Sequence, residues 1–199
     1  MSIEQLYATP ILVKVLDNHK NINYDIGKEI DKINWHTKKE WGEPNHISTT
    51  DFGEDIISSK NLFSLSDAID DCLKEYCKDI DFKMTNYSRK SWILKIKNGH
   101  FAHSHNHAPT DISGVYYYQT TGNDGHFFFE SPNTYFETSK CFRKKYGQRF
   151  LQQPQVGKII LFPGWLRHGV FLNSSNDERI SISFNIKLNS FLYLLQKLV

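Results

Sequence analysis

The sequence predicts a mainly β fold of the α+β class, in which N-terminal helices pack on one face of a β-sandwich or barrel. Two segments in the first half of the chain carry apolar residues at helical spacing, whereas the chain after residue 85 consists of strand-like runs separated by turn sequences. Helices that precede a series of strands are typical of sheets with helices on one face. The 199 residues suit a single domain (1–199), with the opening strand and helices in residues 1–84 and the β core in residues 85–199.

The N-terminal part begins with an expected strand over residues 6–16, where Pro10 is early enough to be tolerated at a sheet edge. A first helix is expected over residues 21–33, because four isoleucines recur there at helical spacing. A second helix, with a similar apolar stripe, is expected over residues 61–80. The polar residues 35–60 between them are expected to form an ordered surface loop.

The C-terminal part contains six strand-like runs, separated by sequences rich in Gly, Asn, Ser and Pro. These runs cover residues 90–97, 111–119, 125–130, 157–164, 168–173 and 179–188. The tail, residues 190–199, fits either a helix or a strand.

The last of these runs alternates between polar and apolar residues. Its even positions are apolar, and its odd positions are Arg179, Ser181, Ser183 and Asn185. A period of two sends the two sets to opposite faces of a strand, and the helices could cover the apolar face. The polar face either meets water or lines a barrel interior and binds a charged ligand, and this strand alone leaves both interpretations open.

The composition excludes several classes of protein. Twenty-four basic and 22 acidic residues give a net charge of +2 without a long block of one sign, so a nucleic-acid partner is not expected. No signal peptide or membrane span is expected, because no long apolar run is present. Three cysteines, Cys72, Cys77 and Cys141, are an odd number and favour reduced thiols in a cytoplasmic protein.

A cluster of histidines indicates a metal site. His103, His105 and His107 alternate with single residues, so in an extended strand they share one face, and either adjacent pair could chelate an ion. His168 follows a strand that ends in a Pro-Gly turn, and barrel metal sites often combine ligands from distant strands. His100 and His126 show no pattern beyond surface exposure or packing.

The spacing around these histidines resembles the two motifs of cupins, which are metal-binding double-stranded β-helix proteins. In the first motif, Gly99, His105 and His107 are followed by Asp111, where an acidic fourth ligand would fall. The second motif runs from residue 157 to 168, and it is imperfect because a tryptophan replaces the expected glycine at position 165.

A closer resemblance appears when the C-terminal segment is included. The segments HNHAPTDISGVYYY, GHFFFESP, VGKIILFPGWLRHGV and ERISISFN, in this order, resemble the Fe(II)/2-oxoglutarate-dependent oxygenase superfamily. More narrowly, they are similar to a group found in phages and marine bacteria, with an H-x-H-P-like motif before S-G-V-Y-Y. The opening residues 6–16 also fit, so the resemblance covers almost the whole chain. It implies a double-stranded β-helix (jelly-roll or cupin-like) core and a dioxygenase that hydroxylates a substrate and releases succinate and CO2.

The resemblance also implies roles for individual residues. His105, His107 and His168 would be the Fe(II) ligands and thus the catalytic residues. Arg179 would pair with the distal carboxylate of 2-oxoglutarate, to which Ser181 could donate a hydroxyl group.

One departure from the superfamily pattern concerns the third ligand. His107 stands where a carboxylate is usual, and Asp111 is the alternative ligand, although Pro109 interrupts strand alternation between them. If the strand register were shifted, His103 would belong to the first pair of ligands. Otherwise His103 is expected to lie next to the ligands or to be exposed. One of three consecutive tyrosines, residues 116–118, is a candidate for hydrogen bonding to the cosubstrate.

Two other functions fit the same residues. One is a cupin-type metal enzyme that does not use 2-oxoglutarate, and the other is a non-catalytic jelly-roll binding or structural protein. The expected partners of the oxygenase are dioxygen and a small-molecule or peptide substrate, recognised by loops 35–60 and 131–153. No membrane partner is expected, and a homodimer is left open. The expected location is the cytoplasm, which would be the host cytoplasm if a phage encodes the chain.

Overall fold

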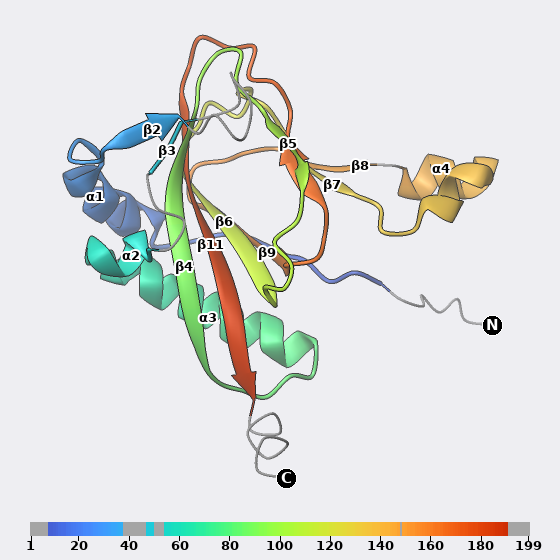
Figure 1. Cartoon of the computed structure of the whole chain (residues 1–199), viewed down its shortest axis with the longest axis horizontal. Helices are drawn as coiled ribbons and strands as arrows, with labels where there is room; N and C mark the ends of the chain where they lie inside the picture. Colours follow the sequence, from blue (N-terminus) through green and yellow to red (C-terminus); the bar gives the residue numbers. More distant parts are fainter. Residues whose placement is uncertain (1–7, 38–46, 50–53, 148, 191–199) are drawn as a thin grey trace.

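A computed structural model describes residues 8–37, 47–49, 54–147 and 149–190. Within them, the strands form two antiparallel sheets that face each other, and helices cover the outer face of the larger sheet (Figure 1). The predicted mainly β fold with N-terminal helices on one sheet is confirmed. No helix among these residues is long and apolar enough to cross a membrane.

The larger sheet has seven strands within the described ranges, in the order β1-β9-β6-β11-β4-β3-β2. Their bounds are β1 Leu12–Val15, β2 Trp35–Thr37, β3 Ile47–Thr49, β4 Met84–Ile96, β6 Ile112–Gln119, β9 Lys158–Pro163 and β11 Arg179–Ser190. The smaller sheet has the order β5-β10-β7-β8, with β5 Ala102–His105, β7 Phe127–Glu130, β8 Arg149–Gln152 and β10 His168–Val170.

The helices are concentrated before the β core, as expected. They are α1 His19–Ile30, α2 Ile56–Ser59, α3 Phe63–Asp79, the 3-10 helix η2 Thr134–Thr138, and α4 Lys140–Tyr146. One core lies between the larger sheet and α1, α2 and α3, and a second core, rich in phenylalanine, lies between the two sheets.

Strand β11 is central, because it pairs with β4 along its whole length and with β6 on its other side. Its even positions, such as Ile182 and Phe184, are fully buried in the core under the helices. Packing here is tight: a Cβ atom at Gly114 would lie 2.3 Å from the Phe184 ring, so only glycine fits. The odd positions Arg179 and Ser181 are buried on the opposite face, between the sheets. The alternation therefore places a buried arginine in the interior, and the interpretation that this face meets water is wrong at these positions.

Two expected loops contain secondary structure. Residues 35–60 include β2, β3 and α2, because β3 pairs with β4 and the buried Ser91 hydroxyl accepts a hydrogen bond from the Ile57 backbone. The second expected loop, 131–153, holds η2, α4 and β8, and β8 pairs with β7. The strands among these elements depend on pairing with β4 and β7 elsewhere in the chain, so local periodicity did not indicate them. The expected strand 6–16 is shorter, and residues 191–199 of the tail lie outside the described residues.

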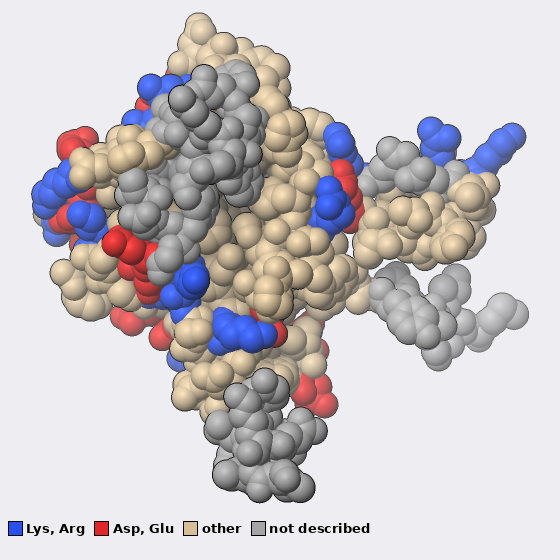
Figure 2. Space-filling model, in the orientation of Figure 1, with Lys and Arg blue, Asp and Glu red and all other residues tan. Residues whose placement is uncertain are grey.

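The segment with η2 and α4 forms an arm that projects from the edge of the smaller sheet (Figure 1). Phe136, Phe142 and Tyr146 stack on one another and hold the arm together. Figure 2 shows basic side chains at its tip.

Candidate active site

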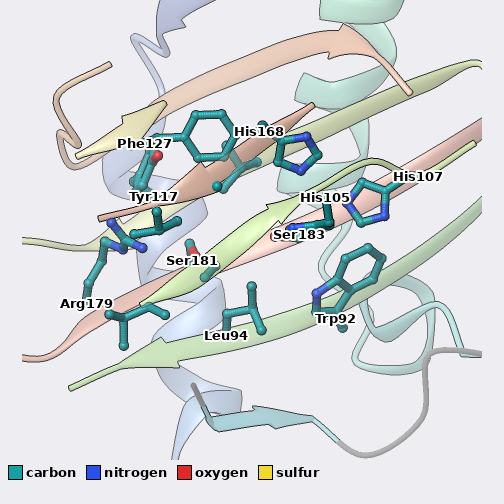
Figure 3. Close-up of a pocket in the computed structure, with 15 residues that line it drawn as sticks. Trp92, Leu94, His105, His107, Tyr117, Phe127, His168, Arg179, Ser181 and Ser183 are labelled. Atoms are coloured by element: carbon teal, nitrogen blue, oxygen red, sulfur yellow. The ribbon is translucent and has the colours of Figure 1, made fainter. Parts of the chain in front are cut away.

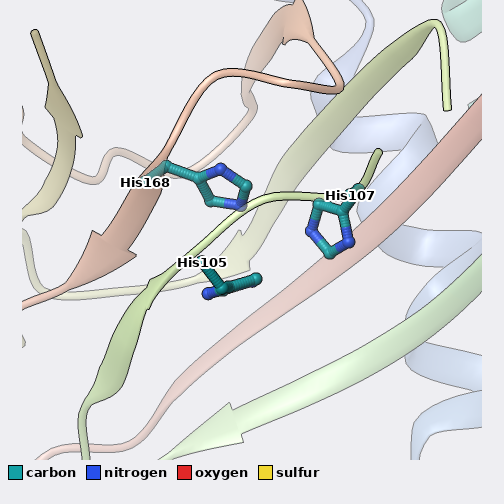
Figure 4. Close-up of side chains that lie close together, drawn as sticks. All are labelled: His105, His107 and His168. Carbon is teal, nitrogen blue, oxygen red and sulfur yellow. The ribbon is translucent and has the colours of Figure 1, made fainter. Parts of the chain in front are cut away.

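The structure brings three of the predicted histidines together at the end of the smaller sheet (Figure 4). His105 ends β5, His168 begins β10 directly opposite it in the ladder, and His107 follows two residues after β5. One ring nitrogen of each lies within 4.8 Å of the others, so the three could hold one metal ion. A distant strand pair thus joins residues that are 61 to 63 positions apart in sequence.

Backbone carbonyls orient two of these rings. Nδ1 of His105 donates to the carbonyl oxygen of His103 at 2.7 Å, and Nδ1 of His168 donates to that of Leu166 at 2.8 Å. Because a carbonyl can only accept, each Nδ1 carries the proton and each Nε2 keeps a lone pair for a metal. In both cases the carbonyl belongs to the residue two positions earlier, so a local backbone contact selects the tautomer.

The surroundings keep the three imidazoles neutral. Burial lowers the pKa of His105 and His168, and burial followed by the charge of His105 lowers that of His107 to about 4. Phe127 stacks on the His168 ring at 5.4 Å, and the Phe162 ring is 4.6 Å away. Neutral imidazole is the form that binds metal, so the apolar wall favours binding at neutral pH.

The alternative ligand Asp111 is used elsewhere. Its Oδ1 accepts from Lys187 Nζ at 3.1 Å and its Oδ2 accepts from the Leu188 backbone nitrogen at 2.8 Å. Asp111 therefore ties β6 to β11, and among the described residues the histidine group contains no carboxylate. His103 contributes its carbonyl oxygen, while its exposed side chain packs edge-on against Phe101.

A cavity between the two sheets connects the histidines with Arg179 (Figure 3). Arg179 and Tyr117 lie at one end, and Trp92 lies at the other end next to His107, with ring centroids 5.6 Å apart. Ser181 and Ser183 project from β11 along the floor between these ends. Sequence patterns did not indicate Trp92, which faces the cavity because it pairs with Ser183 in the register of β4 and β11.

Buried polar atoms without partners lie at the Arg179 end of the cavity. Arg179 is 2% exposed, and its Nη1 donates to the carbonyl oxygen of Gly125 at 2.5 Å. Its Nε and the hydroxyl oxygen of Tyr117 are buried and have no hydrogen-bond partner. Such atoms are costly unless a ligand satisfies them, and a carboxylate accepts from both kinds of donor. The residues present therefore fit an anionic ligand at this end.

The structure also distinguishes the three tyrosines. Tyr117 faces the cavity, whereas the Tyr116 hydroxyl donates to Asn23 Oδ1 at 2.6 Å on the helix side of the sheet. Tyr118 packs against the core under the helices. Alternation along β6 explains the difference, because only the odd position shares a face with Ser181, its partner in β11.

Comparison with known proteins gives one family match by sequence. The family model described as "Putative 2OG-Fe(II) oxygenase" matches residues 90–185, a span that includes all three histidines and Arg179. No curated protein matches the chain by sequence.

Solved structures share the fold at low identity. An oxidoreductase of the 2OG-Fe(II) oxygenase family from Burkholderia pseudomallei is 15% identical with a TM-score of 0.63, covering 89% of this chain and 84% of that one. A prolyl-4-hydroxylase from Pseudomonas putida is 12% identical with a TM-score of 0.59, covering 92% and 94%. The non-heme alpha-ketoglutarate-dependent epimerase SnoN from nogalamycin biosynthesis is 14% identical with a TM-score of 0.62, covering 90% and 76%.

These likenesses confirm the predicted double-stranded β-helix fold. The family match and the histidine group together indicate Fe(II) and 2-oxoglutarate as cofactor and cosubstrate.

Proposed function

We propose that this protein is an Fe(II)- and 2-oxoglutarate-dependent oxygenase, with His105, His107 and His168 as the iron ligands. The observation that carries the proposal is the buried Arg179, which has an unsatisfied donor in the same cavity as three neutral, convergent imidazoles. A metal site alone would fit many enzymes. A metal site and an anion site at two places in one cavity fit a metal-binding dicarboxylate.

The two ends of the cavity would bind different groups. The three histidines would bind Fe(II) through their unprotonated ring nitrogens. Arg179 would hold the far carboxylate of 2-oxoglutarate, with Ser181 and Tyr117 donating hydroxyl groups to it. When bound, Fe(II) and 2-oxoglutarate activate dioxygen, and 2-oxoglutarate is converted to succinate and CO2.

The neutral third ligand affects the charge of the site. With His107 in place of a carboxylate, the protein ligands leave the charge of Fe(II) uncompensated. A 2-oxoglutarate dianion would balance it, so metal and cosubstrate would each favour binding of the other. The phenylalanines around His168 exclude water and strengthen this attraction.

Hydroxylation of a C–H bond is the proposed outcome, and the substrate would be a small molecule or a peptide. The same fold carries epimerase chemistry in SnoN, so the outcome must be measured. The narrower similarity to the phage and marine-bacterial group, the cytoplasmic location and a homodimer stay predictions.

The test is anaerobic loading of the purified protein with Fe(II) and 2-oxoglutarate. A visible charge-transfer band is expected, absent in His168→Ala and weakened in Arg179→Ala, followed by succinate formation when oxygen is admitted. Absence of both the band and succinate would refute the proposal. Turnover of a substrate without 2-oxoglutarate would instead indicate a cupin-type enzyme, and failure to bind any transition metal would indicate a non-catalytic protein.

A further inference from the structure

The loop between β6 and β7 places a second charged group near the cosubstrate end of the cavity. Asp124 in this loop is fully buried, at 0% exposure. The next residue, Gly125, provides the carbonyl oxygen that accepts from Arg179 Nη1 at 2.5 Å. One short loop therefore carries both the backbone contact to Arg179 and a buried carboxylate.

Hydrogen bonds within the loop hold the Asp124 carboxylate. The Thr120 hydroxyl lies 2.8 and 2.7 Å from its two oxygens, and the Thr121 backbone nitrogen donates at 2.9 Å. No ion pair joins Asp124 to a basic side chain in the part of the chain that the structure describes. The hydrogen bonds given for Asp124 therefore come from neutral donors within its own loop.

The loop itself is fixed in position. Gly125 has φ +93°, and a Cβ atom there would lie 2.3 Å from the carbonyl oxygen of Phe171. The Phe171 backbone nitrogen in turn donates to the carbonyl oxygen of His126 at 2.9 Å. This close packing fixes the backbone of the loop that carries Asp124 and the Gly125 contact to Arg179.

The charge of Asp124 nevertheless acts on both polar residues at this end of the cavity. Burial lowers the pKa of the Arg179 guanidinium, whereas Tyr117 and Asp124 oppose this shift. Burial also raises the pKa of Tyr117 to about 12, with Arg179 acting against the increase and Asp124 adding to it. These pKa directions agree with the geometry, in which the residue next to Asp124 contacts Arg179 directly while the two side chains form no ion pair.

We infer that Asp124 is a positioning residue of the cosubstrate site: its charge stabilises the buried Arg179 cation before the cosubstrate binds and leaves donors of the guanidinium free for the incoming carboxylate. The inference rests on the proposed function. A counter-ion in direct contact would occupy those donors, and no counter-ion at all would leave a buried cation uncompensated. A carboxylate that is close to Arg179 but not in contact with it compensates the charge and leaves the donors unoccupied.

This role predicts opposite effects on stability and on affinity. Asp124→Asn keeps an acceptor for Thr120 and Thr121 but removes the charge. The protein without cosubstrate should then lose stability, with the Tm falling by about 5 °C. The dissociation constant for 2-oxoglutarate should decrease about three- to tenfold, because the negative charge that repels its far carboxylate is gone. A residue that only supports the loop would lower both stability and affinity.

The experiment compares wild type, Asp124→Asn and Thr120→Val by calorimetric titration of 2-oxoglutarate into the Fe(II)-loaded proteins under argon. Thr120→Val is the matched control, since it loosens the loop but keeps the Asp124 charge, and it should not tighten binding. The analogue with an amide in place of the far carboxylate should bind Asp124→Asn no better than wild type. Weaker or unchanged 2-oxoglutarate binding in Asp124→Asn, or equal tightening in Thr120→Val, would overturn the inference.

A double variant keeps the test valid if Asp124→Asn does not fold. Asp124→Asn combined with Arg179→Met removes both charges, so it should fold even if Asp124→Asn alone does not. Where Asp124→Asn does fold, the loss in Tm of the double variant should be smaller than the sum of the two single losses. Additive losses, or a double variant that does not fold, would overturn the inference. Failure of the wild type to bind 2-oxoglutarate would refute the proposed function, and this thermal comparison would still report the coupling of Asp124 to Arg179.

Discussion

Replacing Arg179 with methionine should weaken 2-oxoglutarate binding by about two orders of magnitude. Arg179 is 2% exposed and its Nε has no partner within the protein, so the cosubstrate carboxylate would be a main anionic partner of this group. Truncating one partner of a buried, hydrogen-bonded charge pair costs about 2–5 kcal/mol. A value of about 3 kcal/mol corresponds to about 150-fold in the dissociation constant.

Calorimetric titration of 2-oxoglutarate into the Fe(II)-loaded variant under argon would measure this loss. Arg167→Met is the matched control, because Arg167 lies next to the histidines in sequence but its side chain is 53% exposed and pairs with Glu130. That control should bind 2-oxoglutarate within about threefold of wild type, since exposed ion pairs contribute little. A loss of less than about fivefold in Arg179→Met would refute the assignment of Arg179 to the cosubstrate.

Three further predictions follow from individual contacts. His107→Ala should weaken Fe(II) binding at least about 100-fold, whereas Asp111→Ala should leave Fe(II) binding unchanged and lower only the Tm. If metal analysis showed equal losses of metal in both variants, Asp111 would again be a candidate ligand. Tyr117→Phe should weaken 2-oxoglutarate binding about tenfold at unchanged thermal stability, because the hydroxyl has no protein partner; a clear fall in Tm would contradict this. Gly114→Ala should destabilise the protein by about 1–3 kcal/mol in urea unfolding, because the new methyl group overlaps the buried Phe184 ring; an unchanged midpoint would show that the ring can move.

Most strands of the larger sheet, namely β1, β4, β6, β9 and β11, were predictable because each has a strong local pattern. Alternation in β11 placed Arg179 and Ser181 on one face, but it could not say whether that face was buried. The answer depends on the smaller sheet, whose strands are three or four residues long. β5 and β8 were missed because they are short. β2 and β3 were missed because β3 pairs with the distant strand β4, and β2 in turn pairs with β3.

The candidate site was predictable in its residue types and less so in its geometry. The spacing of His105, His107 and His168 indicated a metal site, and the structure brings the three together. The choice between His107 and Asp111 could not be made from the sequence, because it depends on the bond from Asp111 to the Leu188 backbone across β11. Asp124 has no sequence signal, because its burial and the contact of the neighbouring Gly125 with Arg179 arise only in the folded chain.

A crystal structure of the protein grown anaerobically with Fe(II) and 2-oxoglutarate would test the central claim most directly. We expect one metal ion bound by the Nε2 atoms of His105, His107 and His168, and one 2-oxoglutarate whose far carboxylate contacts Arg179. A metal ion bound by Asp111, or a cavity in which Arg179 contacts no carboxylate at saturating 2-oxoglutarate, would contradict the account.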